Sequence, residues 1–340
     1  MASDPRGSSA PIAVLGAGSW GTALAIQFAR TSRPTLLWGR DSVQLAALER
    51  DRCNQRYLPD APFPPALKIE RDLAAVLKAT QDIVVAVPSH ALRGMLQDLV
   101  PLRTSRLRIA WATKGFELST GLLPHQVAAQ LLGTQVPTAV ISGPTFAKEV
   151  GAGLPTAMTI AASDADFSRA LAESISGDNF RAYTSSDITG VEIGGAVKNV
   201  LAIGAGISDG LGFGANTRVA LITRGLVEMT RLGVALGARA ETFMGLAGLG
   251  DLVLTCTDNQ SRNRRFGLAI AAGASMDAAQ KAIGQVVEGV LAARAVREVA
   301  ARASVEMPIC ESLYRVVHEG LAPKAAVKEL MSRALKPEAG

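Results

Sequence analysis

A short glycine-rich segment near the start of the chain constrains its fold more than any other feature. The apolar run Ile12-Ala-Val-Leu15 leads directly into Gly16-Ala-Gly18-Ser-Trp-Gly21, and the alanine-rich stretch 22–30 follows. A second apolar run, Thr35 to Trp38, comes next. Short apolar runs are typical of buried strands and the alanine-rich stretch is typical of a helix. The order therefore predicts a strand, a glycine turn, a helix and a second strand.

The spacing of the three glycines is that of a turn that binds the pyrophosphate of a dinucleotide. Gly16 permits the tight turn, Gly18 lets the pyrophosphate approach the backbone, and Gly21 lets the helix pack closely on the strand. Because a helix N-terminus attracts negative charge, Ser19 and Trp20 are expected beside the phosphates. A glycine turn of purely structural purpose is the alternative, and the strand before it and the helix after it argue against that.

The end of the second predicted strand bears on the choice of nicotinamide cofactor. Where an acidic residue would hold the 2′-hydroxyl of NADH, the sequence reads Trp38-Gly-Arg40-Asp41. An arginine at this place suits the 2′-phosphate of NADPH, so we expect Arg40 to bind the cofactor and NADPH to be favoured. NADH stays open because Asp41 is able to bind a ribose hydroxyl. An exposed turn with a helix cap is the structural alternative.

Alternation of apolar runs with helical stretches continues through the first half of the chain. Further short apolar runs are found at residues 82–87, 107–112, 138–142 and 157–162. Repeated strand-helix alternation of this kind predicts an α/β fold with a mainly parallel, doubly wound sheet of the Rossmann type.

Near Asp187 the sequence changes to helical segments punctuated by glycines. Helices are expected at residues 191–207, 218–232, 251–255, 263–272, 290–301 and 325–335. Because 340 residues exceed the size at which one hydrophobic core usually keeps growing, two domains are expected. We therefore predict a flexible leader at 1–11, a nucleotide-binding domain at 12–187 and an all-helical substrate domain at 188–336.

Composition and the rarer side chains exclude several classes of protein. Only 4% of the residues are aromatic, which disfavours a stacking surface for nucleic acid, and the net charge of +5 is compatible with an anionic small substrate. Cys53, Cys256 and Cys310 match neither a disulfide framework nor a zinc pattern, so a reducing compartment, the cytoplasm, is expected. We expect no membrane anchor, metal site or serine triad, because uninterrupted apolar stretches are short and the histidines are scattered.

Six short blocks, in order along nearly the whole chain, carry a resemblance to a known family. They are Gly16 to Gly21, Ala112-Thr-Lys-Gly115, Ser142-Gly-Pro-Thr-Phe-Ala147, Gly195-Ala-Val-Lys-Asn199, Leu249-Gly-Asp251 and Ser261-Arg-Asn263. With these blocks the chain resembles the bacterial NAD(P)-dependent glycerol-3-phosphate dehydrogenases. The resemblance implies a Rossmann domain followed by a helical domain like that of 6-phosphogluconate dehydrogenase. It also implies a soluble oxidoreductase that uses NADPH or NADH to interconvert dihydroxyacetone phosphate and sn-glycerol 3-phosphate for phospholipid synthesis.

The resemblance assigns the chemistry to two lysines and an aspartate. Lys198 corresponds to the catalytic proton acceptor and also contacts the substrate; its pKa must then lie below the free value of about 10.4. Lys114 follows the strand that ends at Ala112, so it should emerge at the carboxyl edge of the sheet and touch substrate and cofactor together. Asp251 is expected to orient Lys198 beside the substrate and, because it follows a glycine-rich turn, to cap the next helix.

The remaining expected site residues surround the substrate and the cofactor. The resemblance assigns substrate oxygens to Gly143, Thr145, Ser261, Arg262 and Asn263. The last three suit phosphate oxygens, with a helix N-cap beside an exposed arginine as the structural alternative. The resemblance assigns cofactor contacts to Lys114, Ala147, Arg262, Val286 and Glu288.

Two other functions stay open on the residues alone. A different NADPH-dependent reductase with the same helical domain would act on a carboxylated 2-oxo compound, whereas Lys198, Asp251 and residues 261–263 suit a short phosphorylated ketone. A catalytically silent protein that binds NADPH is the second alternative, and the presence of Lys114 and Lys198 gives it no support. A homodimer formed through the helical domain is consistent with the resemblance.

Overall fold

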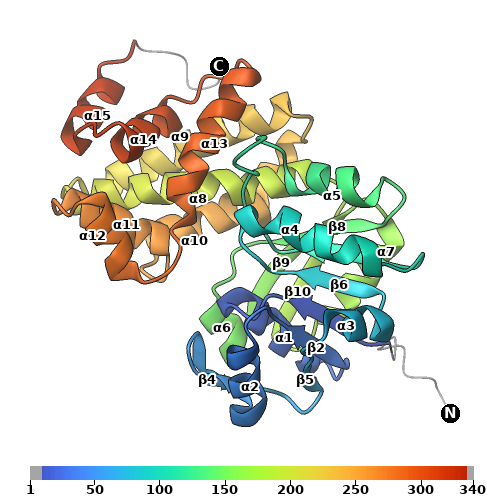
Figure 1. Cartoon of the computed structure of the whole chain (residues 1–340). Helices are drawn as coiled ribbons and strands as arrows, with labels where there is room; N and C mark the ends of the chain where they lie inside the picture. The colour runs from blue at the N-terminus through green and yellow to red at the C-terminus, as the bar shows by residue number, and fades with distance from the viewer. Residues whose placement is uncertain (1–9, 335–340) are drawn as a thin grey trace.

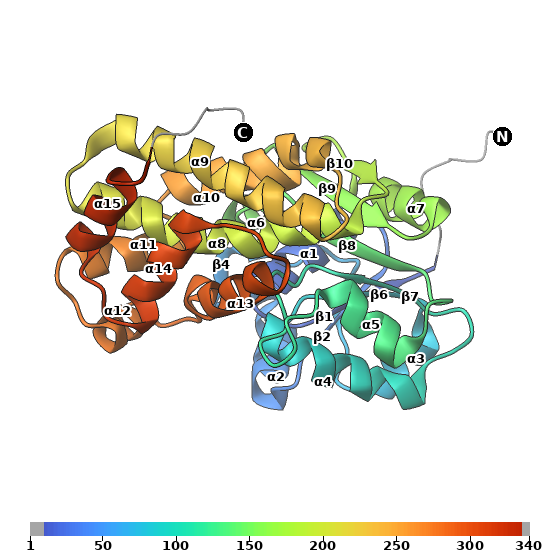
Figure 2. The same ribbon diagram turned by 90° about the horizontal axis from the view of Figure 1, so that it is seen from above.

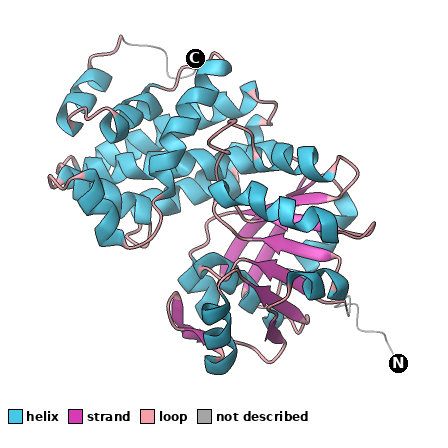
Figure 3. Cartoon of the chain, viewed as in Figure 1, coloured by secondary structure: helices cyan, strands magenta, loops and turns pink. Residues whose placement is uncertain are grey.

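The computed structural model describes residues 10–334, in which a twisted sheet is followed by a bundle of helices (Figures 1 and 3). The strands of the eight-stranded sheet are β1 (Ile12–Leu15), β2 (Thr35–Trp38), β5 (Leu67–Ile69), β6 (Asp82–Val85), β7 (Arg108–Trp111), β8 (Thr138–Ser142), β9 (Thr156–Ala162) and β10 (Phe180–Ser185). Two further strands, β3 (Cys53–Asn54) and β4 (Leu58–Pro62), form a separate antiparallel ribbon.

The strand order places a ligand-binding crevice beside the glycine turn. The spatial order is β10-β9-β8-β7-β6-β1-β2-β5, so the chain first builds outward from β1 through β2 and then returns to the other side of β1 with β6. In open α/β sheets, ligands bind outside the carboxyl ends of the strands where this reversal occurs. The glycine turn directly follows β1 and therefore lies at that crevice.

Helices cover both faces of the sheet because alternate residues of each strand point to opposite sides. In β1, Ile12 and Val14 belong to one hydrophobic core, whereas Ala13 and Leu15 belong to the other. The first core includes residues of α1 (Ser19–Arg30), α2 (Ser42–Asp51), α6 (Ala147–Ala152) and α7 (Ala165–Ile175). The second includes residues of α3 (Leu73–Ala79), α4 (Ser89–Leu99) and α5 (Pro124–Leu132).

One strand pair departs from the parallel arrangement. β9 pairs antiparallel with β8, whereas β10 runs parallel to β9 and the other neighbouring pairs are parallel. Only the short helix α6 separates β8 from β9, so the chain turns back at the carboxyl end of β8 instead of crossing over the sheet. This turn holds Thr145 and Ala147 at the crevice.

The second half of the described chain packs around one long helix. Its helices are α8 (Ile188–Gly210), α9 (Gly214–Ala235), α10 (Asp251–Thr257), α11 (Arg262–Ala271), α12 (Met276–Ile283), α13 (Glu288–Arg302), α14 (Pro308–His318) and α15 (Pro323–Met331). The view from above in Figure 2 shows them gathered beside the sheet, and α8 also contacts β8 and α5. The predicted Rossmann-type sheet followed by helices is confirmed.

Helix α8 is long and apolar enough to cross a bilayer by length and composition, and among the described helices it alone passes that test. Its apolar window is wholly buried inside the protein, with α9, α10, α11, α13 and α14 packed around it. A mostly apolar helix that is covered on all sides in this way is the core helix of its bundle.

Two helices of the bundle and the ends of the chain differ from the sequence-based expectation. α12 and α14 were not predicted, although each carries a start signal: the Ser275 hydroxyl accepts the Ala278 N–H, and Pro308 occupies the first turn of α14. The helix predicted at 325–335 is shorter and ends at Met331. Of the predicted leader, residues 1–9 lie outside the described residues.

Candidate active site

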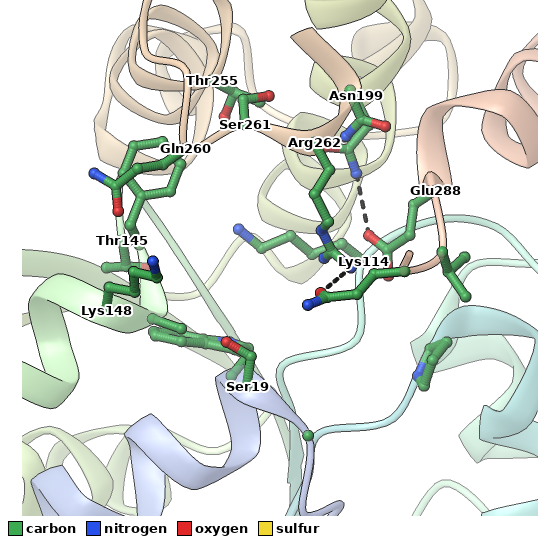
Figure 4. A pocket seen from close by; sticks show the side chains of 18 of the residues that line it. Ser19, Lys114, Thr145, Lys148, Asn199, Thr255, Gln260, Ser261, Arg262 and Glu288 are labelled. Carbon is green, nitrogen blue, oxygen red and sulfur yellow. Dashed lines mark hydrogen bonds between the residues drawn. The ribbon is translucent and has the colours of Figure 1, made fainter. Parts of the chain in front are cut away.

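A cavity of about 880 Å³ lies between the carboxyl edge of the sheet and the helical bundle. Figure 4 shows Thr145 and Lys148 on one side of it and Arg262 and Glu288 on the other. The sequence-predicted site residues that line the cavity are Gly18, Ser19, Trp20, Lys114, Thr145, Ala147, Lys198, Asp251, Ser261, Arg262, Asn263, Val286 and Glu288. Those that do not line it are Gly16, Gly21, Arg40 and Gly143.

The glycine turn at the start of α1 fits the pyrophosphate of a dinucleotide. Gly16 has φ +126°, and a Cβ there would lie 2.5 Å from the Ala86 carbonyl oxygen, so the tight turn requires glycine. A Cβ at Gly18 would meet no protein atom within 4 Å and would point into open space beside the cavity. Among residues 10–334, no side chain caps α1, so its first N–H groups are available to an anion.

A cluster of two lysines and one aspartate lies on the bundle side of the cavity. Lys114, in the turn after β7, donates to Asp251 Oδ2 at 2.7 Å. Lys198, on α8, donates to Asp251 Oδ1 and to Thr255 Oγ1, the latter at 3.0 Å. Asp251 and Thr255 both belong to α10 and lie one turn apart. Two ammonium groups therefore share a single carboxylate that is 1% exposed.

Burial and mutual charge set the acid strength of this cluster. Desolvation lowers the pKa of Lys198 to about 8, the neighbouring Lys114 adds to the fall, and the Asp251 carboxylate opposes it. For Asp251, burial acts to raise the pKa, but the two ammonium groups outweigh it and hold the pKa below its ordinary value. With a pKa of about 8, Lys198 is able to donate a proton as the ammonium and to accept one as the neutral amine near neutral pH.

The local sequence explains why Asp251 faces the lysines. A π-helical turn at Leu246–Gly250 leads directly into α10, so that Asp251 becomes the first residue of that helix. The N-cap position is taken by Gly250, and no side chain in the described part of the chain caps the helix. The expectation that Asp251 caps α10 is therefore wrong, because its carboxylate is engaged by Lys114 and Lys198 instead.

The start of α11 forms another wall of the cavity. Ser261 is its N-cap and accepts the Arg264 N–H at 3.2 Å. Arg262 is half-buried and donates only to the neutral Gln285 Oε1, at 3.2 Å, among the hydrogen bonds of the described residues. A guanidinium without a carboxylate partner beside a helix N-terminus suits the oxygens of a phosphate.

An amide network joins this wall to α8 and α13. Asn263 donates to Asn199 Oδ1 at 2.9 Å and accepts the Gly289 N–H at 2.9 Å. Asn199 in turn donates to Glu288 Oε2 at 3.3 Å, the contact dashed in Figure 4. Asn263 thus has one N–H left for a ligand, and Glu288 keeps its other oxygen toward the cavity.

The turn after β8 contributes unequally to the cavity. Thr145 and Ala147 line it, and the Thr145 hydroxyl donates to the Gly143 carbonyl at 3.2 Å. Gly143 lies behind them, where a Cβ would come 2.9 Å from Met158 Cα of β9. Thr145 and Ala147 are therefore the members of this turn that face a ligand in the cavity.

The predicted 2′-phosphate contact lies on the surface beside β2. Arg40 pairs with Asp98 at 2.8 Å, and both side chains are at least half exposed. Asp41 Oδ1 accepts the N–H groups of Val43 and Gln44 and so caps α2. Because an exposed ion pair is weak, Arg40 is free to exchange Asp98 for a more strongly charged anion.

Several cavity residues were missed from the sequence. Thr255 carried a readable signal, because it follows Asp251 by four residues on a helix and must share its face. Asn199 stood beside Lys198 without an assigned role. Arg56 and Tyr57, which reach the cavity from the loop between β3 and β4, carried no signal, because a distant ribbon brings them there.

Known proteins match both halves of the chain. The profile of the N-terminus of NAD-dependent glycerol-3-phosphate dehydrogenase matches residues 11–168, and that of the C-terminus matches residues 187–328. Glycerol-3-phosphate dehydrogenase [NAD(P)+] of Aeromonas hydrophila is 57% identical over 328 residues, which are 96% of this chain and 98% of that protein.

Solved structures agree with the profiles. A crystal structure of glycerol-3-phosphate dehydrogenase from Coxiella burnetii has 50% identity and a TM-score of 0.92, covering 95% of this chain and 99% of that chain. A ketopantoate reductase from Ralstonia eutropha, at 15% identity and a TM-score of 0.59 over 93% of this chain and 99% of that one, shares the fold alone. The chain belongs to the NAD-dependent glycerol-3-phosphate dehydrogenase family.

Proposed function

We propose that Lys198 is the proton donor and acceptor in the reaction of this family. The chain is an oxidoreductase that reduces dihydroxyacetone phosphate to sn-glycerol 3-phosphate with NADPH or NADH, a step toward phospholipids. The observation that carries the role of Lys198 is that two ammonium groups and one buried carboxylate meet beside the cavity.

In the direction of reduction, a nicotinamide held in the cavity would supply a hydride to the carbonyl carbon of the substrate, C2. The C2 oxygen then gains negative charge and takes a proton from Lys198 Nζ, which becomes a neutral amine. In oxidation the neutral Lys198 removes the hydroxyl proton. A pKa of about 8 supports both directions, because neither protonation state is rare near neutral pH.

Lys114 and Asp251 hold the reacting groups in place. Lys114 remains beside Lys198 and stabilises the negative charge that develops on the C2 oxygen. Asp251 orients both ammonium groups and compensates their charge, because it accepts from each of them through a different oxygen. Thr255 fixes Lys198 from the other side through its hydroxyl.

The substrate phosphate is assigned to the start of α11. Ser261, Arg262 and Asn263 lie together there, and Arg262 has its guanidinium available. Thr145 binds a substrate hydroxyl from the opposite wall, with Gly143 supporting the turn. A phosphate at α11 and a carbonyl at Lys198 define a short phosphorylated ketone, whereas a carboxylated 2-oxo compound would leave Arg262 without its dianionic partner.

The cofactor is assigned to the glycine turn and the adjoining walls. The glycine turn, with the N–H groups of Ser19 and Trp20 and the glycines Gly16, Gly18 and Gly21, would hold its pyrophosphate, and Ala147 and Lys114 would hold the nicotinamide. Val286, Glu288 and Arg262 would contribute to the cofactor site from the bundle. We assign Arg40 to the 2′-phosphate of NADPH, which would replace Asp98 as the partner of the guanidinium.

Further proposals concern organisation and location. We propose that residues 12–187 bind the nucleotide, that residues 188–336 bind the substrate, and that the enzyme works in the cytoplasm. A homodimer through the bundle is supported by α9, on which Val219 and Val234 are 61% and 50% exposed and lie near one helix face. Sedimentation of the Val219→Glu variant against the unaltered enzyme tests the dimer.

The experiment that tests the proposed function follows the oxidation of NADPH and NADH by absorbance. The purified protein is given dihydroxyacetone phosphate, dihydroxyacetone, or a carboxylated 2-oxo compound such as ketopantoate. Rapid oxidation only with the phosphorylated ketone supports the assignment. Oxidation only with the 2-oxo acid would show that the substrate is a carboxylated 2-oxo compound. Tight NADPH binding without turnover would show that the protein binds the cofactor without catalysis.

A further inference from the structure

A second buried carboxylate lies on α8, outside the cavity. Glu192 is 3% exposed and does not line the cavity. It accepts three hydrogen bonds: from Trp111 Nε1 at 2.8 Å, from the His125 backbone N–H at 3.0 Å, and through its contact with His125 Nδ1 at 2.6 Å. A buried carboxylate is costly to desolvate, so its partners fix its position closely.

The two partners of Glu192 belong to β7 and α5, so its hydrogen bonds join three elements: α8, β7 and α5. Trp111 is the last residue of β7 and precedes Lys114 by three residues, and His125 lies in the first turn of α5. Glu192 precedes Lys198 by six residues on α8, a distance of about 9 Å along the helix axis. One carboxylate therefore ties the segments that carry the two lysines of the active site.

Helix α8 lies close to the Lys114 side chain beside these hydrogen bonds. A Cβ at Gly195 would lie 3.3 Å from Lys114 Cγ, which is tighter than an ordinary van der Waals contact. Gly195 lies between Glu192 and Lys198 in sequence. A small rotation or slide of α8 would change the separation of Lys114 and Lys198, and with it the sharing of Asp251.

We propose that Glu192 is a positioning residue that locks α8 against β7 and α5, so that Lys198 and Lys114 meet on Asp251. The proposal rests on the proposed function of those two lysines. Glu192 lies outside the cavity lining, so it acts through the backbone segments that carry Lys114 and Lys198. Misplacement of a reacting group by about 1 Å is enough to lower a rate by about 10²-fold.

The hydrogen bonds of Glu192, more than its charge, carry this role. Burial raises the pKa of Glu192, and the bonds from His125 and Trp111 oppose that rise. Glutamine keeps an acceptor oxygen for Trp111 and the His125 N–H, and its amide N–H is able to donate to a neutral His125 ring. Alanine removes all three bonds, and Trp111→Phe removes one and replaces the buried indole with a smaller aromatic ring.

The chain offers a matched control. Glu228, on α9, is also 3% exposed, and its carboxylate accepts the backbone N–H groups of Ile309 and Cys310 at 2.7 and 3.1 Å. Glu228→Ala removes the carboxylate that binds the start of α14 and leaves a buried cavity of similar size, at a position that does not line the active-site cavity. Glu228→Ala therefore reports the loss of stability that any buried carboxylate of this bundle would cause.

The test measures kcat, KM for dihydroxyacetone phosphate, NADPH Kd and Tm for Glu192→Ala, Glu192→Gln, Trp111→Phe and Glu228→Ala. We expect kcat to fall by about 10²-fold in Glu192→Ala and by about tenfold in Trp111→Phe, and to be restored to within about threefold in Glu192→Gln. The Kd of NADPH should be unchanged, because the hydrogen bonds of Glu192 do not involve the glycine turn. Glu228→Ala should lower Tm and leave kcat unchanged.

The outcomes separate this proposal from the function on which it depends. If Glu192→Ala and Trp111→Phe lower Tm as Glu228→Ala does but keep kcat, Glu192 is structural and the proposal is overturned. Should Glu192→Ala fail to fold, Trp111→Phe decides, and an unchanged kcat there overturns it as well. Full activity in Lys198→Ala would instead overturn the proposed role of Lys198 as proton donor and acceptor.

Discussion

The two ends of the cavity are built in different ways. At the cofactor end, the proposed pyrophosphate site is one turn of consecutive residues between β1 and α1. At the chemical end, Lys114 and Asp251 are 137 residues apart, and Lys198 and Asp251 are 53 apart. The cofactor end is thus local backbone geometry, whereas the chemical end exists only after the sheet and the bundle have packed together.

This difference separates binding from chemistry. The glycine turn needs no charged side chain, because backbone N–H groups and the helix N-terminus attract the pyrophosphate. The chemical end holds three charged groups in a buried place, where each would be unfavourable without the others. Substitutions at the cofactor end should therefore weaken cofactor binding and spare turnover. Substitutions at the chemical end should lower turnover and spare cofactor binding.

The largest effect is expected for Lys198→Ala. Loss of the proton donor should lower kcat by about 10³-fold while the Kd of NADPH stays the same, because the glycine turn is intact. Stopped-flow turnover and NADPH fluorescence measure the two quantities. An equal loss of cofactor affinity would mean that the two ends are not separable.

Gly18→Ala is the matched variant at the other end. Its φ of −78° suits alanine, and the added methyl group meets no protein atom within 4 Å, so the fold should be retained. The methyl group lies where the pyrophosphate approaches, so the Kd of NADPH should rise by about tenfold. A drop in kcat at saturating NADPH comparable to that of Lys198→Ala would contradict the separation of cofactor binding from chemistry.

The next largest effect is expected for Asp251→Asn. Without the carboxylate, the ammonium of Lys198 loses its stabilising charge, and its pKa should fall below about 8. The decline of reduction with rising pH should therefore begin at lower pH, and kcat at neutral pH should drop by about 10²-fold. Asp258→Asn, at a cavity residue that binds the Gln260 N–H instead, is the control and should keep the wild-type pH profile.

The same contrast explains what the sequence was able to predict. The glycine turn, β1 and α1 were readable because apolar runs and glycine spacing are local signals. The roles of Lys114, Lys198 and Asp251 came only through a resemblance, because no spacing rule relates residues that distant. The hydrogen bonds of Asn199 and Asn263 were not predicted, since they depend on how α8 and α11 pack. Thr255 was missed although its spacing from Asp251 places both residues on one helix face.

The pH dependence of the unaltered enzyme gives a smaller effect that reports on the chemical end alone. Reduction requires protonated Lys198, so kcat should fall by about tenfold per pH unit above about 8. Oxidation requires the neutral amine, so its kcat should rise with pH and level off above that value. NADPH Kd should not follow this titration. Parallel profiles in both directions would exclude Lys198 as the shared proton donor and acceptor.

The smallest effect is expected at the margin of the cofactor end, where a side chain supplements the backbone. Arg40→Ala should raise the Kd of NADPH by about tenfold and the Kd of NADH by less than about twofold, because only NADPH carries a 2′-phosphate for the guanidinium. Asp98→Asn, which removes the present partner of Arg40, should leave NADPH affinity equal or tighter. Isothermal titration of both cofactors measures this discrimination. Equal weakening of NADPH and NADH by Arg40→Ala would assign the 2′-phosphate to another residue and leave the glycine turn as the main determinant of affinity.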